Sequence, residues 1–251
     1  MSAGWEHLGH QALTGRRVLV TGAAKRIGRT LALELARAGA DVAISYRGSA
    51  AEAEATVREL RSLGRRALAV ACDVQREASV EAAVAQVTAE FGGLDLLVNN
   101  AGAFETAPLE SITAAQWDAM FATNTRGPFL VAKAAFPHLK SARGRIVNIG
   151  SLGGIHPWAT HAHYCTSKAA LHMLSQTMAK AWAPEISVNC VAPGMIVTSG
   201  EVGTGYESFA AKTPMKRNGT PQDVASAVVF FATAPHFITG QLLAVDGGLG
   251  L

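Results

Sequence analysis

A serine, a tyrosine and a lysine stand near one another past the middle of the chain, at Ser151, Tyr164 and Lys168. Tyr164 and Lys168 are four residues apart, and apolar residues follow at helical spacing, so a helix would place both side chains on one face. A free phenol has a pKa of about 10, and an ammonium one turn away is expected to lower it toward neutrality. Ser151 can donate a hydrogen bond to the same reacting oxygen. The pattern therefore indicates acid/base chemistry, although a tyrosine and a lysine at this spacing also occur on ordinary surface helices.

Composition places the chain among folded proteins and excludes several function classes. Of its 251 residues 49% are apolar and 16% charged, which suits a sizeable core. The net charge of +3 is too small to indicate nucleic-acid binding, no apolar run is long enough to span a membrane, and the first residues show no secretory signal. Cys72, Cys165 and Cys190 fit neither a disulfide framework nor a metal motif, so we expect buried free thiols in a cytoplasmic protein.

A glycine-containing turn follows the first predicted strand, Arg17–Thr21. Apolar residues at four-residue steps come next and predict a helix that ends at Gly39. In a turn of this kind Gly22 permits the tight bend and Gly28 lets the helix lie close to the strand, while N–H groups at the helix start can bind a pyrophosphate. An ordinary strand-to-helix turn can carry the same two glycines, so this pair alone leaves both interpretations open.

The end of the second predicted strand, Asp41–Tyr46, bears on cofactor choice. An acidic residue there binds the ribose 2′-hydroxyl of NAD, whereas a basic residue accommodates the 2′-phosphate of NADP. This chain has Arg47 and Ser49, with Lys25 and Arg26 in the nearby glycine turn, and no acid at the strand end. The pattern favours NADP. Ser49 also opens a capping-box sequence for the next helix, and a phosphate at the same helix N-terminus is compatible with that role.

Polar and small residues follow two more predicted strands. Asp73 comes shortly after the strand Ala67–Ala71, where it can contact an adenine edge or cap the following helix, and both interpretations stay open. The strand Leu94–Val98 is followed by Asn-Asn-Ala-Gly at positions 99–102, small and amide residues that suit close passage of a ligand.

The second half of the chain continues the alternation of strands and helices. A capping box opens a long helical region from Thr113 to about Lys140, and Asn124 inside it is expected on local grounds to face solvent. A loop-rich stretch runs from Met195 to about Met215, and Thr220 is expected to cap another helix that has a proline in its first turn. The remaining strands are predicted at Arg145–Ile149, Ile186–Val191 and Leu242–Val245.

This alternation predicts an α/β fold with a parallel sheet of about seven strands and helices on both faces. No linker, break in composition or repeat divides the chain. We therefore expect an N-terminal extension at 1–14 and a single doubly wound domain at 15–251.

Several motifs agree in order and spacing with one family, and the chain resembles the short-chain dehydrogenase/reductase family from about Gly15 to Gly248. The matching pieces are Thr21-Gly22 with Gly28, Asp73, Asn99-Asn-Ala-Gly102, Asn124, Ser151, Tyr164 with Lys168, Pro193-Gly194 and Asp246-Gly-Gly248. The resemblance implies a Rossmann fold and an NADP-dependent enzyme that interconverts a small-molecule carbonyl compound and its alcohol. It also implies a homotetramer built through the two long helices containing Asn124 and Tyr164.

The resemblance assigns catalytic roles to four residues. Tyr164 would be the general acid in carbonyl reduction and the base in alcohol oxidation. Lys168 would lower the pKa of that tyrosine and hold the nicotinamide ribose hydroxyls. Ser151 would position the substrate oxygen. Asn124 would bend its helix and hold a water in a proton relay, which replaces the solvent-facing interpretation.

The resemblance also implies binding residues. The expected cofactor site consists of Gly22, Lys25, Arg26, Ile27, Gly28, Arg47, Ser49, Asp73, Val74, Asn100, Ala101, Gly102, Tyr164, Lys168, Pro193, Gly194, Ile196 and Thr198. Candidates for an apolar substrate pocket are Phe104, Trp158, Met195 and Tyr206, each of which also suits ordinary packing. The 195–215 stretch looks like the family's mobile substrate loop. His156, His161 and His163 form no convincing metal pattern and are interpreted as loop or surface residues.

One departure from the family pattern concerns Arg26, which stands where the family usually carries glycine. Arginine there, with Arg47 and Ser49 after the second strand, is similar to pteridine reductases, in which an aromatic residue at the position of Phe104 stacks on the pterin. Those enzymes typically carry Asp at the position of Ser151 and Ser at that of Gly102. The C-terminal half looks equally like 3-oxoacyl-carrier-protein reductases. We therefore expect an NADPH-dependent carbonyl reductase, with a pteridine reductase and a non-catalytic NADPH-binding sensor or scaffold as alternatives.

Overall fold

The computed structural model describes residues 11–198 and 204–251, and its centre is one parallel sheet. The strand order is β3-β2-β1-β4-β5-β6-β7, and each neighbouring pair runs parallel. The strands are β1 (Arg17–Val20), β2 (Asp41–Tyr46), β3 (Ala67–Ala71), β4 (Leu96–Asn99), β5 (Arg145–Ile149), β6 (Ser187–Pro193) and β7 (Leu242–Val245). The predicted Rossmann-type fold is confirmed, and the predicted strand ends lie within two residues of these.

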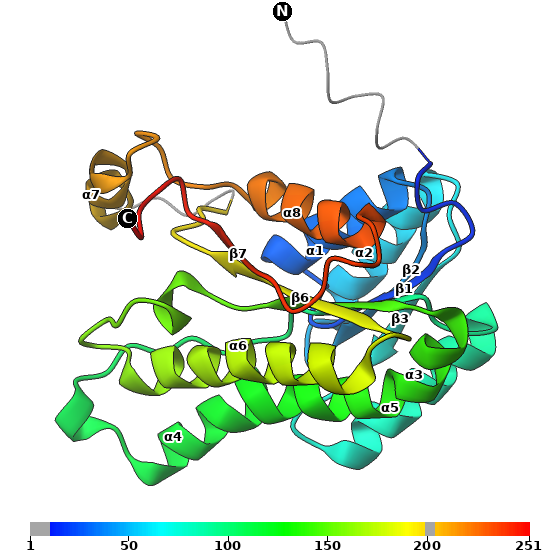
Figure 1. The fold of residues 1–251 in the computed structure, drawn as a ribbon, viewed down its shortest axis with the longest axis horizontal. Coiled ribbons are helices and arrows are strands. Elements are labelled where there is room, and N and C mark those ends of the chain that lie inside the picture. Colours follow the sequence, from blue (N-terminus) through cyan, green and yellow to red (C-terminus); the bar gives the residue numbers. More distant parts are fainter. Residues whose placement is uncertain (1–10, 199–203) are drawn as a thin grey trace, which may run out of the picture.

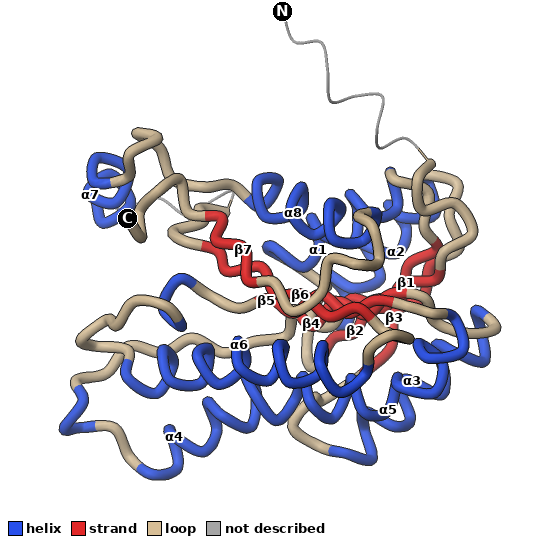
Figure 2. Tube along the Cα trace, viewed as in Figure 1, coloured by secondary structure: helices blue, strands red, loops and turns tan. Residues whose placement is uncertain are grey.

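Helices cover both faces of the sheet (Figures 1 and 2). One layer contains α1 (Arg26–Arg37), α2 (Ala50–Ser62) and α8 (Pro221–Thr233), and the other contains α3 (Glu77–Phe91), α5 (Gly127–Ala142) and α6 (Ala162–Trp182). The shorter helical segments are α4 (Ala114–Phe121), α7 (Thr204–Lys212), the 3-10 turns at Leu109–Ser111 and Leu152–Gly154, and a π-helical turn at Ala122–Arg126.

Two apolar cores lie between the sheet and these layers, one on each face. Side chains alternate along a strand, so Val18 and Val20 belong to the core under α1, while Leu19 belongs to the core under α5. Leu31 of α1 is fully buried in the first core and Leu139 of α5 in the second. Burial on both faces explains why the central strands are mostly apolar rather than alternating.

The strand order reverses between β1 and β4, and this point places the candidate site. The chain leaves β1 at Thr21, whose N–H donates to the carbonyl of Val98 in β4 over 3.0 Å. The glycine turn at residue 22 and the amide-rich segment after β4 therefore meet at the carboxyl edge of the sheet. In open α/β sheets a ligand crevice forms outside the strand ends at such a reversal.

The predicted capping box at Thr113 is present, and the predicted helix cap at Thr220 is also a capping box. The Thr113 and Thr220 hydroxyls accept the N–H groups of Gln116 and Asp223, whose side chains bond back to the cap residues. The predicted box at Ser49 is wrong, because no side-chain bond caps α2 and the Ser49 backbone is not extended there. Glu52, its expected partner, points instead toward Lys25, 3.9 Å away.

Of the two interpretations of Asp73, the structure contradicts the one in which it caps α3. The N-cap of α3 is Arg76, so Asp73 does not cap this helix. Its carboxylate accepts the Gln75 N–H over 3.1 Å within the preceding turn, since Asp readily closes such local turns. The adenine contact therefore stays a prediction.

The stretch from Met195 to Met215 contains a helix that the sequence did not indicate. Its glycines and prolines predict loop, but the run after Gly205 has neither residue and includes good helix formers such as Ala211 and Lys212. Helix α7 forms there. Residues 199–203 of the predicted loop, and residues 1–10 of the predicted extension 1–14, lie outside the described residues. Leu13, in the described part of that extension, packs into the first core.

The three cysteines are free and buried, as predicted. Within residues 11–198 and 204–251, no helix has the length and apolar composition needed to cross a membrane.

Asp95 ties the start of β1 to the start of β4. Its carboxylate accepts the Arg17 backbone N–H over 2.9 Å and the Arg17 Nε over 2.6 Å, and its side chain is 9% exposed. Although burial works to raise it, these hydrogen bonds hold the pKa of Asp95 below its usual value. Stability from a depressed carboxyl pKa is present above the unfolded value and is lost as pH falls through the folded one.

We expect Asp95→Ala to lower the free energy of unfolding at pH 7 by about 2 kcal/mol, because it removes the carboxylate from a partly buried guanidinium that then keeps only its bond to the Gly92 carbonyl. The difference in unfolding free energy between this variant and the unsubstituted protein should become smaller below about pH 4. Urea unfolding at the two pH values measures both effects. Glu54→Ala, which removes an exposed carboxylate on α2, is the control. Equal stability of Asp95→Ala and Glu54→Ala at pH 7 would contradict the assignment.

Candidate active site

Helix α6 brings Tyr164 and Lys168 to the carboxyl end of β5. The helix starts at Ala162, so the two residues lie one turn apart, as predicted. Lys168 is 5% exposed, and its Nζ donates to the carbonyl of Ile149, the last residue of β5, over 2.8 Å. Burial lowers the pKa of Lys168 to about 8, and the nearby Cys190 thiol opposes this shift. The ammonium is thus fixed on the strand end.

The predicted lowering of the Tyr164 pKa is wrong for the protein as it stands. Burial of the phenol raises its pKa, and a hydrogen bond with Ser151 only partly offsets that effect. The physical reason is that burial penalises the phenolate, while Lys168 is bonded to the Ile149 carbonyl. At neutral pH Tyr164 is therefore a protonated phenol, the form that a proton donor needs.

Ser151 follows β5 closely and is 3% exposed. Its hydroxyl oxygen accepts the Gly153 N–H over 3.1 Å, which caps the short turn at Leu152–Gly154. Ser151 acts on the pKa of Tyr164, so the two side chains lie near each other, which the predicted shared role needs.

Asn124 is fully buried, so the solvent-facing interpretation from local pattern is wrong. It lies in the π-helical turn between α4 and α5, where the helix deviates from regular geometry, as the resemblance implied. Its amide donates to the Ala103 carbonyl and to Ser167 Oγ over 3.0 Å each, and its Oδ1 accepts the Ala103 N–H over 2.8 Å. Asn124 thereby joins α6 to the segment after β4.

The glycine turn has the close backbone packing expected of a pyrophosphate site. Gly22 has φ +63°, and a Cβ there would lie 2.8 Å from the Cα of Ala101. A Cβ on Gly28 would lie 2.4 Å from Asn100 Nδ2, whose amide donates to the Gly22 carbonyl over 3.0 Å. No side chain caps the N-terminus of α1, and its first turn has no acid. These features fit a diphosphate bound at the helix start.

Thr21 was matched to the family pattern from the sequence but was assigned no role there. Its hydroxyl oxygen accepts the N–H groups of both Asn100 and Ala101, each over 3.0 Å. It fixes the segment after β4 against the turn after β1. Its place directly before Gly22 is the sequence signal that was available.

The cations predicted to favour NADP lie on the surface beside this turn. Lys25, Arg26 and Arg47 are exposed, and the Ala23 N–H donates to the Ser45 carbonyl, which brings the turn against the end of β2. Arg26 has φ +55°, a left-handed conformation that favours glycine. This explains why the resembled family usually has glycine there and shows that this chain accepts the strain of an arginine.

The segment after β4 passes close to two of the predicted catalytic residues. A Cβ on Gly102 would lie 3.4 Å from Asn124 Oδ1 and 3.6 Å from Lys168 Nζ, so this backbone lies beside both polar groups. Pro193 ends β6, and the Gly194 N–H donates to Val245 in the adjacent strand over 3.0 Å. The predicted residues of the 193–198 segment therefore follow a strand end on the same edge of the sheet.

Aromatic side chains surround Tyr164. The Phe104 ring is 62% exposed and meets the Tyr164 ring edge-on, with centroids 4.8 Å apart. Trp158 lies parallel to Tyr164 at 6.1 Å, and His161 stacks on Phe104 at 4.8 Å. Two of the four predicted substrate residues, Phe104 and Trp158, thus lie at the phenol.

The other predicted residues have local roles in this structure. The Met195 and Tyr206 carbonyls accept hydrogen bonds from Gly219 and Asn218. Val74 is buried where a Cβ on Gly127 would touch it, and Ile27 packs against the first core. Ile196 forms an isolated bridge with Gly219, and Thr198 is 8% exposed. Their binding roles stay predictions.

The interpretation of the three histidines is wrong at one position. His156 is exposed, and His161 is the N-cap residue of α6 and bonds to Thr106 over 2.9 Å. His163 is fully buried, with Nε2 3.7 Å from Glu105, because the first turn of α6 directs it inward. Among the residues described, no group of three or more His, Cys, Asp or Glu could hold a metal ion.

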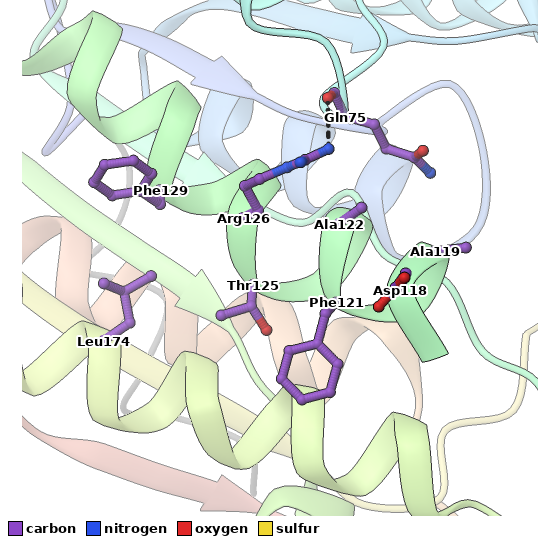
Figure 3. A pocket seen from close by; sticks show the side chains of 9 residues that line it. All are labelled: Gln75, Asp118, Ala119, Phe121, Ala122, Thr125, Arg126, Phe129 and Leu174. Carbon is purple, nitrogen blue, oxygen red and sulfur yellow. Dashed lines mark hydrogen bonds between the residues drawn. The ribbon is translucent and has the colours of Figure 1, made fainter. Parts of the chain in front are cut away.

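An open hollow of about 700 Å³ lies outside this site. Figure 3 shows Arg126, Phe129 and Leu174 among its lining residues, with the Arg126 guanidinium bonded to the Gln75 carbonyl over 3.1 Å. The π-helical turn contributes to both regions, since it directs Asn124 inward while Thr125 and Arg126 line the hollow. None of the lining residues is a predicted catalytic residue.

A family model and known relatives match this chain over most of its length. The model of the family described as enoyl-(acyl carrier protein) reductase matches residues 22–250. An uncharacterized oxidoreductase of Methylorubrum extorquens is 37% identical over 245 residues, which are 94% of this chain and 98% of the relative. A 3-oxoacyl-[acyl-carrier-protein] reductase of Staphylococcus epidermidis is 35% identical over 240 residues, 93% of this chain and 98% of that protein.

Solved structures are similar over nearly the same length. A short-chain dehydrogenase from Burkholderia cenocepacia in complex with NADP has a TM-score of 0.90 and 39% identity, covering 96% of this chain and 100% of that one. A blue fluorescent protein from a metagenomic library in complex with NADPH has a TM-score of 0.91 and 35% identity, with the same coverage. With its motifs, its fold and these similarities in agreement, the chain belongs to the short-chain dehydrogenase/reductase family and is similar within it to 3-oxoacyl-carrier-protein reductases.

Proposed function

We propose that this protein is an NADPH-dependent carbonyl reductase that oxidises the corresponding alcohol in the reverse direction. The observation that supports this most strongly is the meeting of Ser151, Tyr164 and buried Lys168 at the carboxyl edge of the sheet, beside the glycine turn. That edge is where open α/β sheets bind dinucleotides, and a protonated phenol there is suited to act on a carbonyl oxygen.

Two observations support NADP(H) as the cofactor. Arg47, Lys25 and Arg26 are exposed cations at the ends of β1 and β2, where a 2′-phosphate would need positive charge. Two similar structures are complexes with NADP or NADPH. The glycine turn would hold the pyrophosphate and Lys168 the ribose hydroxyls of the nicotinamide half. The bound nicotinamide supplies or accepts the hydride.

The protein's own groups then handle the proton. Tyr164 would donate it to the substrate oxygen as negative charge develops there, and Ser151 would hold the same oxygen with a second hydrogen bond. Lys168 would stabilise the phenolate that remains, and Asn124 would support a water that returns the proton. These roles suit reduction at neutral pH, because Tyr164 is protonated there.

Phe104 and Trp158 would form the apolar wall beside the reacting oxygen, with Met195 and Tyr206 as further substrate contacts. A 3-oxoacyl group is one candidate substrate, given the similarity to a 3-oxoacyl-[acyl-carrier-protein] reductase.

A second candidate is pteridine reduction, which the exposed ring of Phe104 beside Tyr164 favours. A non-catalytic sensor or scaffold is the alternative outside enzymes. NADPH oxidation with a panel of ketones, quinones and pterins separates the three.

We further propose a homotetramer in the cytoplasm. Exposed apolar residues on α4, α5 and α6, including Trp117, Phe129 and Met173, suit contacts between subunits. The three buried free thiols are consistent with a reducing compartment.

We expect Tyr164→Phe to reduce turnover with the best substrate of the panel by at least about a thousandfold, because the proton donor is lost while the ring packing remains. NADPH affinity, measured by fluorescence titration, should stay within about threefold. Retained turnover in a folded Tyr164→Phe protein would reject the role of this phenol.

The two reaction directions should depend on pH in opposite ways. Reduction needs the phenol and oxidation needs the phenolate, and the raised pKa of Tyr164 keeps the phenol at neutral pH. Initial rates of reduction should therefore hold near neutrality and fall at alkaline pH, while rates of alcohol oxidation should rise with pH. Reduction that becomes faster toward alkaline pH would contradict this assignment.

We expect Arg47→Asp to weaken NADPH binding at least about tenfold more than NADH binding, since the new carboxylate repels a 2′-phosphate and accepts a bond from a 2′-hydroxyl. Fluorescence titration with both nucleotides measures the ratio. Arg58→Asp, the same charge change at an exposed position on α2, is the control and should leave the ratio unchanged. Equal losses for the two nucleotides in Arg47→Asp would show that Arg47 does not select the phosphate.

A further inference from the structure

His172 lies one turn beyond Lys168 on α6, and none of the roles above uses it. His172 is only 8% exposed, and its Nε2 accepts a hydrogen bond from the backbone N–H of Ser151 over 3.3 Å. Lys168, four residues earlier, donates to the carbonyl of Ile149. Two side chains of α6 therefore bond to the backbone that follows β5. One bond is at Ile149 and the other is at Ser151, two residues later.

Two glycines make room for this imidazole. A Cβ on Gly150 would lie 2.3 Å from His172 Nε2, and a Cβ on Gly154 would lie 2.5 Å from His172 Cε1. Any side chain at either position would displace the ring or the segment. The glycines on both sides of the serine turn thus fit an imidazole that contacts the backbone directly.

The ring is in the state that this contact needs. Burial, with the nearby Lys168 ammonium, lowers the pKa of His172 to about 4, while a backbone hydrogen bond with Gly154 opposes the shift. The imidazole is neutral near pH 7, so Nε2 keeps its lone pair for the Ser151 N–H. Without it, that buried N–H would lose this acceptor.

We propose that His172 is a positioning residue that fixes Ser151 so that the serine hydroxyl and the Tyr164 phenol converge on one substrate oxygen. This inference rests on the proposed function. His172 touches neither substrate nor cofactor in it. It acts through the Ser151 backbone, whose orientation sets where the hydroxyl points.

The test compares His172→Leu, which removes the acceptor, with His172→Gln, which offers an amide oxygen in its place. We expect His172→Leu to lower kcat at least about tenfold, with NADPH affinity within about twofold, and His172→Gln to recover most of the loss. The control is Ser175→Ala on the same helix face, which loses the bond from Asn148 over 2.8 Å but leaves Ser151 untouched. Its kcat should stay within about twofold of the unsubstituted protein.

A second comparison separates positioning from general damage to the fold. In a Ser151→Ala background, His172→Leu should cost less than about twofold further in kcat, because the hydroxyl that it positions is gone. A full tenfold loss in that background would overturn the proposal, as would an unchanged kcat in folded His172→Leu. Should His172→Leu not fold, the same cycle with His172→Ala decides by the same two outcomes, since alanine also removes the acceptor.

A crystallographic readout keeps this test independent of the proposed activity. If the unsubstituted protein oxidises NADPH with no ketone of the panel, the proposed function fails, but the position of Ser151 can still be measured. The Ser151 hydroxyl should move by about 1 Å in His172→Leu and not in Ser175→Ala. A Ser151 that stays in place in His172→Leu would overturn the positioning role.

Discussion

The candidate site depends on how α6 is attached to the end of β5. Burying an ammonium is costly unless it is hydrogen-bonded, and Lys168 meets that need at the Ile149 carbonyl, 2.8 Å away. Because the lysine is fixed there, Tyr164 one turn earlier is carried to the strand end that delivers Ser151. The candidate chemistry therefore depends on contacts between side chains of α6 and the backbone at the end of β5, with Lys168 on Ile149 and His172 on Ser151.

The candidate site also contains two departures from regular backbone geometry. The π-helical turn at Ala122–Arg126 directs the Asn124 amide into the protein, where it joins Ser167 of α6 to Ala103. Arg26 accepts a left-handed backbone in the turn after β1. Such deviations gather at functional sites, because the surrounding structure must hold them against a local cost of about 1 to 3 kcal/mol.

Most of the fold could be predicted from the sequence, and so could the candidate residues Ser151, Tyr164 and Lys168. The alternation of apolar strands and amphipathic helices is a local property, so strand positions and sheet class followed from it. Features that depend on tertiary contacts could not be predicted from the local sequence pattern. Asn124 and His163 resemble surface residues by local pattern but are buried by packing between helices. The Tyr164 pKa depends on burial, which the four-residue spacing to Lys168 does not report. His172 was missed although it repeats that spacing after Lys168, because its partner is a backbone N–H.

The proposed function requires a protonated phenol where a nicotinamide and a carbonyl substrate meet. A crystal structure of the complex with NADPH tests this most directly. It should show the pyrophosphate at the start of α1, Lys168 within hydrogen-bond distance of the nicotinamide ribose, and the Tyr164 hydroxyl facing the nicotinamide ring. A dinucleotide bound elsewhere, or a ring that the Tyr164 hydroxyl does not face, would contradict the enzymatic account and leave only the fold.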